Sequence, residues 1–286
     1  MSQTMQRLLL GFAGVFVSFC AIPTDLQAQT AKDHVGRGGA WYKRGEYDKA
    51  IDECNQALRL TPNYADAYIG RGSAWEHKGE YGKAIDEFTE AIRFNPNYAE
   101  AHYNRGRVWK DQGEYDKAIA DYNDAVRLKP KYADAYNNRG NVWEKKGEHD
   151  KAIADYNEAV RLKPKDFNAY YNRGLAWYES GEYDDAIADY GEAIRLDPKD
   201  AYAYVHRGIA WDRKGEYDKA IMDFTDAIRL KPKDGVAYYN RAIAYEKKGE
   251  KPKAAQDFAK ATKFGYNPTG YESGKPANKP EAKGAK

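Results

Sequence analysis

The sequence has few cysteines, little net charge and no long apolar run beyond its first residues. Its two cysteines are Cys20, inside the N-terminal apolar stretch, and Cys54. A framework of disulfides within one chain is therefore excluded. Cys54 stands where equivalent positions hold Phe or Tyr, so we expect a buried, unreactive thiol. The chain carries 46 Lys and Arg against 44 Asp and Glu. This balance gives no reason to expect a nucleic acid as partner.

Motifs of catalysis, phosphate binding and metal binding are also missing. The sequence has no glycine-rich phosphate loop, no nucleophile elbow and no pair of closely spaced cysteines. Its five histidines are scattered, and no two of them have the spacing of metal ligands on one helix. We therefore predict no metal and no cofactor, and a protein that is not an enzyme.

Residues 1–28 differ from the rest of the chain. Arg7 is the only charged residue before Asp25, and residues 8–22 form an uninterrupted run of apolar and small residues. This run is too short to span a bilayer comfortably. The pattern is typical of a secretory signal peptide.

The expected cleavage site lies between Ala28 and Gln29, where a small residue precedes the cut. Cleavage there would leave no membrane span, and we predict a bacterial protein that is exported to the periplasm or secreted. The alternatives are an uncleaved anchor and a lipoprotein signal at Cys20.

A period of 34 residues organises the remaining sequence. Its markers are Trp41, Trp75, Trp109, Trp143, Trp177 and Trp211, then Gly45, Gly79, Gly113, Gly147, Gly181, Gly215 and Gly249, and Pro62, Pro96, Pro130, Pro164, Pro198 and Pro232. Such regularity predicts a stack of one supersecondary unit. The units are placed at 31–64, 65–98, 99–132, 133–166, 167–200, 201–234 and 235–268. A tail rich in Lys, Pro and Ala follows at 269–286 and is expected to be disordered.

Each unit is expected to form two helices. Tyr68, Gly72 and Trp75 have the i, i+4, i+7 spacing of one helix face. Gly79 can end that helix in the left-handed conformation. A second apolar face follows until Pro96, which cannot continue the hydrogen-bond ladder. One such hairpin cannot bury its apolar faces alone and must stack on its neighbours.

The unit resembles the tetratricopeptide repeat. The positions that carry the resemblance are Tyr68, Gly72, Trp75, Ala84, Phe88, Ala91 and Pro96, and they recur over residues 31–268. The resemblance implies an all-α fold, an α-solenoid of seven helical hairpins that forms a right-handed superhelix. It also implies that the first helix of every hairpin lines a concave groove. The six tryptophans share one position between helices, where we expect packing rather than carbohydrate stacking.

Every unit also pairs an arginine with an acid sixteen residues later. The arginines are Arg37, Arg71, Arg105, Arg139, Arg173, Arg207 and Arg241, and the acids are Glu53, Glu87, Asp121, Asp155, Asp189, Asp223 and Asp257. In an antiparallel hairpin the two positions can face each other. We predict partly buried structural ion pairs, for which the planar guanidinium is well suited. The alternative is a row of arginines that binds anions.

The resemblance places a ligand in the groove, against the second, fifth, ninth and twelfth residues of the units. Middle units supply polar side chains there and later units supply apolar and aromatic ones. The predicted groove residues are Arg107, Asn137, Asn141, Tyr171, Leu175, Tyr178, Tyr202, Val205, Ile209, Tyr239 and Ile243. An apolar stripe that the hairpin core does not need favours a peptide or helix of another protein as partner. In the alternative interpretation, neighbouring first helices cover much of the stripe.

The expected function is a protein-binding scaffold in the cell envelope. Two other functions stay open at this point. The array could associate with itself through the stripe or through its lightly capped end, or it could carry a glycan or another small molecule in the same groove.

Overall fold

The computed structural model describes residues 24–266 and consists there of helices and short turns. The predicted signal sequence before residue 24 and the predicted tail at 269–286 lie outside the described residues. Fourteen helices are present in the described part: α1 (Thr24–Lys43), α2 (Tyr47–Leu60), α3 (Ala65–His77), α4 (Tyr81–Phe94), α5 (Ala99–Asp111), α6 (Tyr115–Leu128), α7 (Ala133–Lys145), α8 (His149–Leu162), α9 (Phe167–Glu179), α10 (Tyr183–Leu196), α11 (Ala201–Arg213), α12 (Tyr217–Leu230), α13 (Gly235–Lys247) and α14 (Lys251–Lys263). They form seven hairpins, so the predicted α-solenoid is confirmed.

The first helices α3 to α13 begin at the first residue of their predicted units, whereas α1 begins seven residues early. Ala31 opens the predicted first unit, but α1 already starts at Thr24. Ala28 and Gln29 therefore lie within this helix, and the Gln29 amide donates to Asp33 at 3.0 Å. Cleavage after Ala28 stays a prediction.

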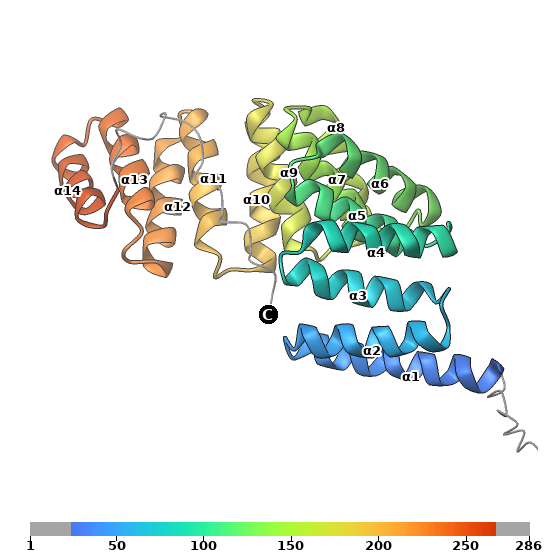
Figure 1. Cartoon of the computed structure of the whole chain (residues 1–286). Helices are drawn as coiled ribbons and strands as arrows, with labels where there is room; N and C mark the ends of the chain where they lie inside the picture. The colour runs from blue at the N-terminus through green and yellow to red at the C-terminus, as the bar shows by residue number, and fades with distance from the viewer. Residues whose placement is uncertain (1–23, 267–286) are drawn as a thin grey trace, which may run out of the picture.

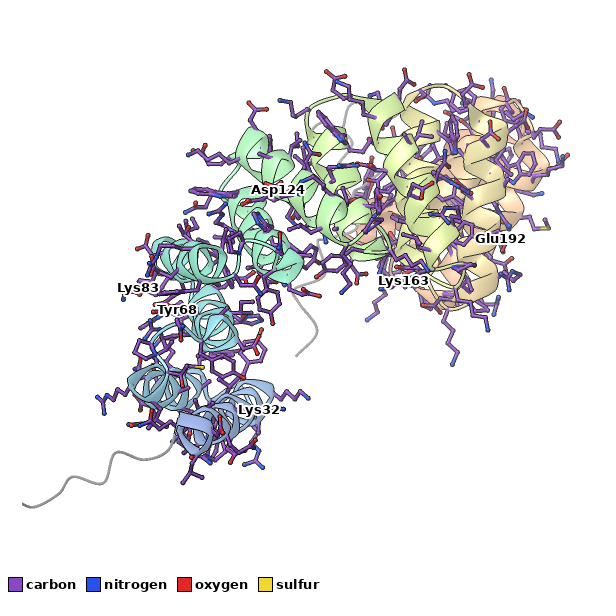
Figure 2. The ribbon with its side chains drawn as sticks, turned by 90° about the vertical axis from the view of Figure 1, so that its right-hand side faces the viewer. Lys32, Tyr68, Lys83, Asp124, Lys163 and Glu192 are labelled. Carbon is purple, nitrogen blue, oxygen red and sulfur yellow. The ribbon has the colours of Figure 1, made fainter. Side chains whose placement is uncertain are left out.

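The hairpins stack side by side in a bent array. Figure 1 shows the succession from α1 to α14, and the view turned by 90° shows the array as an arc (Figure 2). Each first helix contacts the next first helix along the chain, from α1 with α3 to α11 with α13. Within residues 24–266 no two second helices touch one another. The first helices therefore lie closer together and form the concave face.

The turn inside each hairpin depends on a glycine. Gly79 has φ +77°, and its six equivalents have φ between +74° and +85°. The N–H of Glu80 donates to the carbonyl of Trp75 at 3.0 Å and closes the turn. Residues with a Cβ are disfavoured in this left-handed region. The predicted helix stop at these glycines is confirmed.

A second glycine lets the two helices of a hairpin approach closely. A Cβ added at Gly140 would lie 2.7 Å from Cε1 of Tyr156. Tyr156 is fully buried, as are Phe88, Tyr122, Tyr190 and Phe224 at the equivalent position. Cys54 takes this position in the first hairpin and is also buried, and burial raises the pKa of its thiol to about 11. The predicted burial of this thiol is confirmed, and the raised pKa agrees with the expected low reactivity.

The six tryptophans are only partly buried. The predicted packing between helices therefore applies to one face of each ring. On the other side a lysine from the following helix lies over the ring in five units. The ammonium of Lys83, for example, lies 4.3 Å from the centroid of Trp75. Such stacking of a lysine on an indole covers apolar area while the charge stays in water. In the fifth unit Asp185 replaces this lysine.

Candidate functional site

All seven arginines of the predicted series contact the acid sixteen residues later. In the fourth unit Arg139 donates from Nε and Nη2 to the two carboxylate oxygens of Asp155, at 2.8 and 2.6 Å. Both side chains are largely buried. The predicted structural ion pairs are confirmed, and six of the seven arginines are at most 23% exposed, whereas Arg37 in the first unit is 51% exposed.

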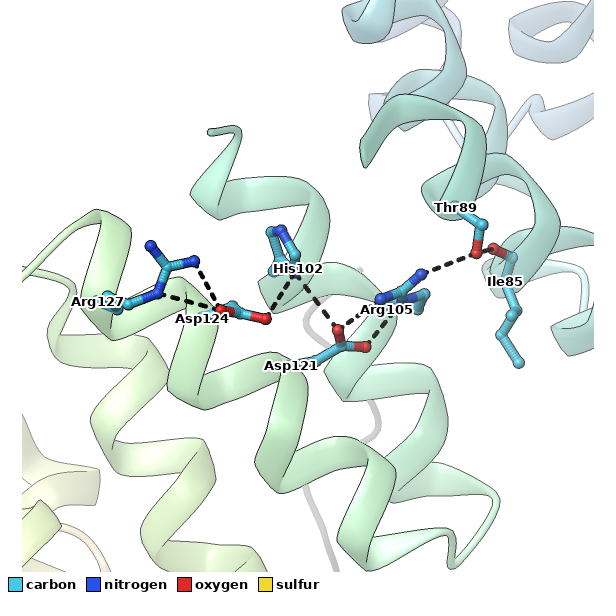
Figure 3. A network of polar contacts seen from close by, with 7 residues as sticks. All are labelled: Ile85, Thr89, His102, Arg105, Asp121, Asp124 and Arg127. Atoms are coloured by element: carbon cyan, nitrogen blue, oxygen red, sulfur yellow. Dashed lines mark hydrogen bonds and ion pairs between the residues drawn. The ribbon is translucent and has the colours of Figure 1, made fainter. Parts of the chain in front are cut away.

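The arginines also make a contact that the sequence analysis missed. Their remaining nitrogen, Nη1, reaches back to the second helix of the preceding hairpin. Arg139 donates to Asn123 Oδ1 at 2.6 Å, and Arg105 donates to Thr89 Oγ1 at 3.0 Å. Figure 3 shows Arg105 between Thr89 on one side and Asp121 on the other. Five of the seven arginines make this contact. Each of the five holds two helices of its own hairpin and ties that hairpin to the one before, and they are Arg71, Arg105, Arg139, Arg173 and Arg241.

Gly191 interrupts this series. It occupies the position of Asn123 and Thr89, so Arg207 Nη1 has no side chain to reach in α10; an added Cβ would lie 3.7 Å from that nitrogen. We expect Gly191→Asn to raise the free energy of unfolding by about 1 kcal/mol, because it supplies a charged hydrogen bond and removes a helical glycine. Urea unfolding followed by circular dichroism measures this change.

The matched control is Gly82→Asn in α4, where nothing lies within 4 Å of an added Cβ. That variant gains helix propensity alone, on the order of 0.3 kcal/mol. Equal gains in the two variants would contradict the missing bond to Arg207.

Consecutive first helices are joined by polar contacts on the concave side. The Asn138 amide donates to the hydroxyl of Tyr103 at 2.8 Å, and Tyr171 pairs with His206 at 2.8 Å in the same relative positions two units later. Near the other end of these helices, Arg213 Nε donates to the hydroxyl of Tyr178 at 2.9 Å. These contacts fix the spacing of the first helices.

The structure buries four of the eleven predicted groove residues. Tyr171, Tyr178, Val205 and Ile209 are between 3% and 9% exposed. They pack in one apolar cluster of the fifth to seventh units. These four side chains fill the space between first helices, so a ligand on the concave face would not reach them in this conformation. The apolar stripe expected from the sequence is correspondingly narrower.

The other seven keep part of their surface exposed, and they are Arg107, Asn137, Asn141, Leu175, Tyr202, Tyr239 and Ile243. Arg107 forms an ion pair with Glu76 of the preceding unit, so its charge is already matched. Asn172 donates its amide to Asn137 Oδ1 and Asn141 Oδ1, at 3.3 and 3.1 Å. The amide nitrogens of Asn137 and Asn141 themselves donate to no described residue.

The concave face thus has two parts. The middle of the array offers amide donors from α7, and the later units offer partly exposed apolar and aromatic side chains from α9, α11 and α13. No helix between residues 24 and 266 combines the length and the apolar character needed to cross a membrane. In the same range no three His, Cys, Asp or Glu residues are grouped so that they could hold a metal ion.

Comparisons with known proteins agree on one family. Models described as TPR repeat match residues 106–147, 144–180 and 213–249. Models described as tetratricopeptide repeat match residues 40–99, 87–120 and 167–200. One curated relative, the TPR repeat-containing thioredoxin TTL4 of Arabidopsis thaliana, is 44% identical over 34 residues, which is 12% of this chain and 5% of the plant protein.

Solved structures share the fold at low identity. A tetratricopeptide repeat protein from Parabacteroides merdae superposes with a TM-score of 0.60 at 21% identity, over 84% of this chain and 94% of that one. PilF of Pseudomonas aeruginosa gives a TM-score of 0.65 at 19% identity, over 72% and 94%. YrrB, a TPR protein with an unusual peptide-binding site, gives 0.58 at 23% identity, over 64% and 95%.

Repeats of this kind are in general scaffolds for contacts between proteins. The seven hairpins, their glycine turns and the matched segments lead to one conclusion. The chain belongs to the tetratricopeptide repeat family.

Proposed function

We propose that the protein is an exported, non-enzymatic scaffold that binds a peptide segment or helix of another envelope protein on its concave face. The observation that carries the proposal is the pair of adjacent surfaces on the first helices. Amide donors of Asn137 and Asn141 lie in the middle of the array, and partly exposed apolar side chains follow it in the later units.

The chemistry of these surfaces defines the partner segment. Amide N–H groups bind backbone or side-chain carbonyls, so the segment needs free acceptors opposite α7. Leu175, Tyr202, Tyr239 and Ile243 require apolar side chains opposite α9, α11 and α13. The same fold carries a peptide-binding site in YrrB.

A rigid array supports binding without a large ordering cost. Arginines of five units tie successive hairpins together, and contacts such as Asn138 with Tyr103 join the first helices. A surface already held in its bound shape loses little conformational entropy when a partner docks. The partner can then be held by a modest apolar area.

The groove assignment is tested by the double variant Leu175→Lys with Ile243→Lys. Both side chains are partly exposed, and two charges there should weaken partner binding more than tenfold while helicity is kept. The matched control is Met222→Lys on the second helix α12, where the side chain is 61% exposed on the convex side. Affinity capture from an envelope extract, followed by mass spectrometry, compares the three proteins.

A partner captured by the natural chain and by Met222→Lys, but not by the double variant, supports the proposal. A partner captured equally by a folded double variant would move the site away from the concave face. Concentration-dependent light scattering in the absence of any partner would favour self-association instead.

Export is tested separately. We expect the protein recovered from the periplasm or medium of a bacterial host to begin at Gln29, as read by N-terminal sequencing. A protein that stays in the cytoplasm with residues 1–28 intact would contradict the proposed location and leave the groove proposal standing.

A further inference from the structure

The described chain ends on the concave side of the last first helix. After α14, Gly265 turns the backbone with φ +82°. The N–H of Tyr266 then donates to the carbonyl of Ala261 at 3.0 Å. The ring of Tyr266 lies on the ring of Tyr239, with centroids 4.5 Å apart. Because Tyr239 is one of the predicted groove residues of α13, the described chain ends beside the predicted groove.

The residue at the start of α13 leaves room for Tyr266 at this place. The first residue of the unit is alanine in five of the seven units, but it is Gly235 in the last one. A Cβ at Gly235 would lie 2.8 Å from Cβ of Tyr266 and 3.0 Å from the carbonyl oxygen of Ala261. Glycine therefore permits the close contact that fixes Tyr266.

An earlier unit shows what normally follows such a contact. Tyr132 lies on Tyr103 with ring centroids 4.8 Å apart, in the same way as Tyr266 on Tyr239. The next first helix, α7, begins at the following residue, Ala133. In the 34-residue period a further unit would begin at residue 269, but residues 267–286 lack the repeat pattern.

The chemistry of residues 267–286 matches that of the surface ahead of them. This segment contains three prolines, one tyrosine, and four lysines against two glutamates. The helices α9, α11 and α13 and their caps carry six acids against two bases, once the three arginines and the cap residues Lys214 and Lys248 are set aside because they pair with acids of the second helices. The acids are Asp166, Glu179, Asp200, Asp212, Asp234 and Glu246, and the bases are Arg213 and Lys247. Outside those pairs these helices are therefore acidic while the segment is basic, and Tyr202 and Tyr239 keep part of their surface exposed.

The segment is also long enough. Twenty residues reach at most roughly 65 Å when extended, whereas adjacent packed helices are roughly 10 Å apart. The distance from α13 to α9 is therefore within reach. Extended proline-containing segments dock on surfaces lined by aromatic side chains with little loss of entropy.

We propose that residues 267–286 bind the concave face of α9, α11 and α13 of the same chain and compete there with the partner. This inference rests on the proposed function, because it assigns a regulatory occupant to the same surface. A partner would have to displace the segment, whose local concentration is in the millimolar range because it is tethered.

The test uses the full chain and a synthetic fluorescent peptide of residues 267–286 as probe. In one variant the four lysines of the segment, Lys275, Lys279, Lys283 and Lys286, are changed to glutamate. We expect the probe to bind this variant at least tenfold more tightly than the natural chain, measured by fluorescence anisotropy. Adding Leu175→Lys with Ile243→Lys to that variant should abolish probe binding, and adding Met222→Lys should not.

Equal probe affinity for the natural chain and the lysine-to-glutamate variant would overturn the proposal, and so would no binding to either. If the natural chain sediments as a monomer at all concentrations, the segment binds the concave face of its own chain. If the natural chain forms dimers and the lysine-to-glutamate variant does not, the segment binds a second copy, and the proposal is overturned. The partner capture with Leu175→Lys and Ile243→Lys is independent of these results. The regulatory proposal can therefore fail while the groove proposal stands.

Discussion

Replacing Arg139 with methionine is expected to lower the free energy of unfolding by about 3–5 kcal/mol. The change leaves Asp155, which is 5% exposed, without its bidentate partner, and it also breaks the bond to Asn123. Burial raises the pKa of Asp155, and the Arg139 guanidinium opposes that rise. Urea unfolding at neutral pH, followed by circular dichroism, measures the loss.

The pH dependence of this loss separates charge from packing. Without Arg139 the pKa of the Asp155 carboxyl should rise further, because burial acts alone. A carboxyl with a raised pKa opposes folding when it is ionised, so the cost of Arg139→Met should shrink as the pH falls and Asp155 takes up a proton. A cost that is the same at pH 7 and pH 5 would assign the effect to lost packing.

Two further variants make the test specific. Arg161 pairs with Glu158 at 2.6 Å on the surface of α8, and both side chains are at least 40% exposed. Arg161→Met should therefore cost less than about 1 kcal/mol. The double variant Arg139→Met with Asp155→Leu should recover much of the loss, since it removes the buried charge. If Arg139→Met costs no more than Arg161→Met, the buried pair is not a main support of the array.

The ion pairs were predictable because their geometry follows from the hairpin itself. Two helices joined by a tight turn run antiparallel, so residues sixteen apart, such as Arg139 and Asp155, face each other once the turn at Gly147 is known. The third partner was missed, although the sequence carries the signal. Asn123 lies sixteen residues before Arg139, and an amide or hydroxyl recurs at this position in every unit from the first to the sixth except at Gly191.

The groove could be predicted only in part, because its width depends on how successive units turn against one another. The resemblance to the tetratricopeptide repeat places Tyr171 and Ile209 on the concave side of their helices, but it does not say how closely α9 and α11 approach. In the structure the large side chains of these helices fill the space between them and become buried. Smaller or polar residues such as Asn137 and Asn141 leave surface exposed. The sequence therefore located the face, and packing between units decided which residues a ligand can reach.

The second prediction with a large expected effect is a loss of folding stability in acid that depends on His206. This residue is 1% exposed, its Nδ1 pairs with the Tyr171 hydroxyl, and its Nε2 has no partner among the described residues. Its ring stacks on Tyr190, and Asp200 is the charge that acts on it. Burial lowers the pKa of His206 from its ordinary value of 6.5 to about 4, and the charge of Asp200 opposes this shift. The neutral imidazole is therefore the form that fits the fold.

The sign of the pH dependence follows from that shift. The unfolded chain takes up a proton below about pH 6.5, while the folded chain resists it until about pH 4. His206 therefore contributes its full stability above pH 6.5 and loses it progressively as the pH falls to 4. The total loss is about 3 kcal/mol, at 1.36 kcal/mol for each pKa unit.

His206→Asn should remove this acid sensitivity. Asn138 occupies the equivalent position two units earlier and donates its amide to Tyr103 at 2.8 Å. An asparagine at 206 can therefore bond Tyr171 in the same way without titrating. We expect the variant to match the natural chain within about 1 kcal/mol at pH 7 and to exceed it in stability by pH 4.5. The control is His77→Asn, the same exchange at an exposed histidine, which pairs with Tyr42 at the end of its helix. Urea unfolding between pH 7 and pH 4.5 compares the three proteins, and parallel profiles for the natural chain and His206→Asn would show that His206 is not the acid-sensitive group.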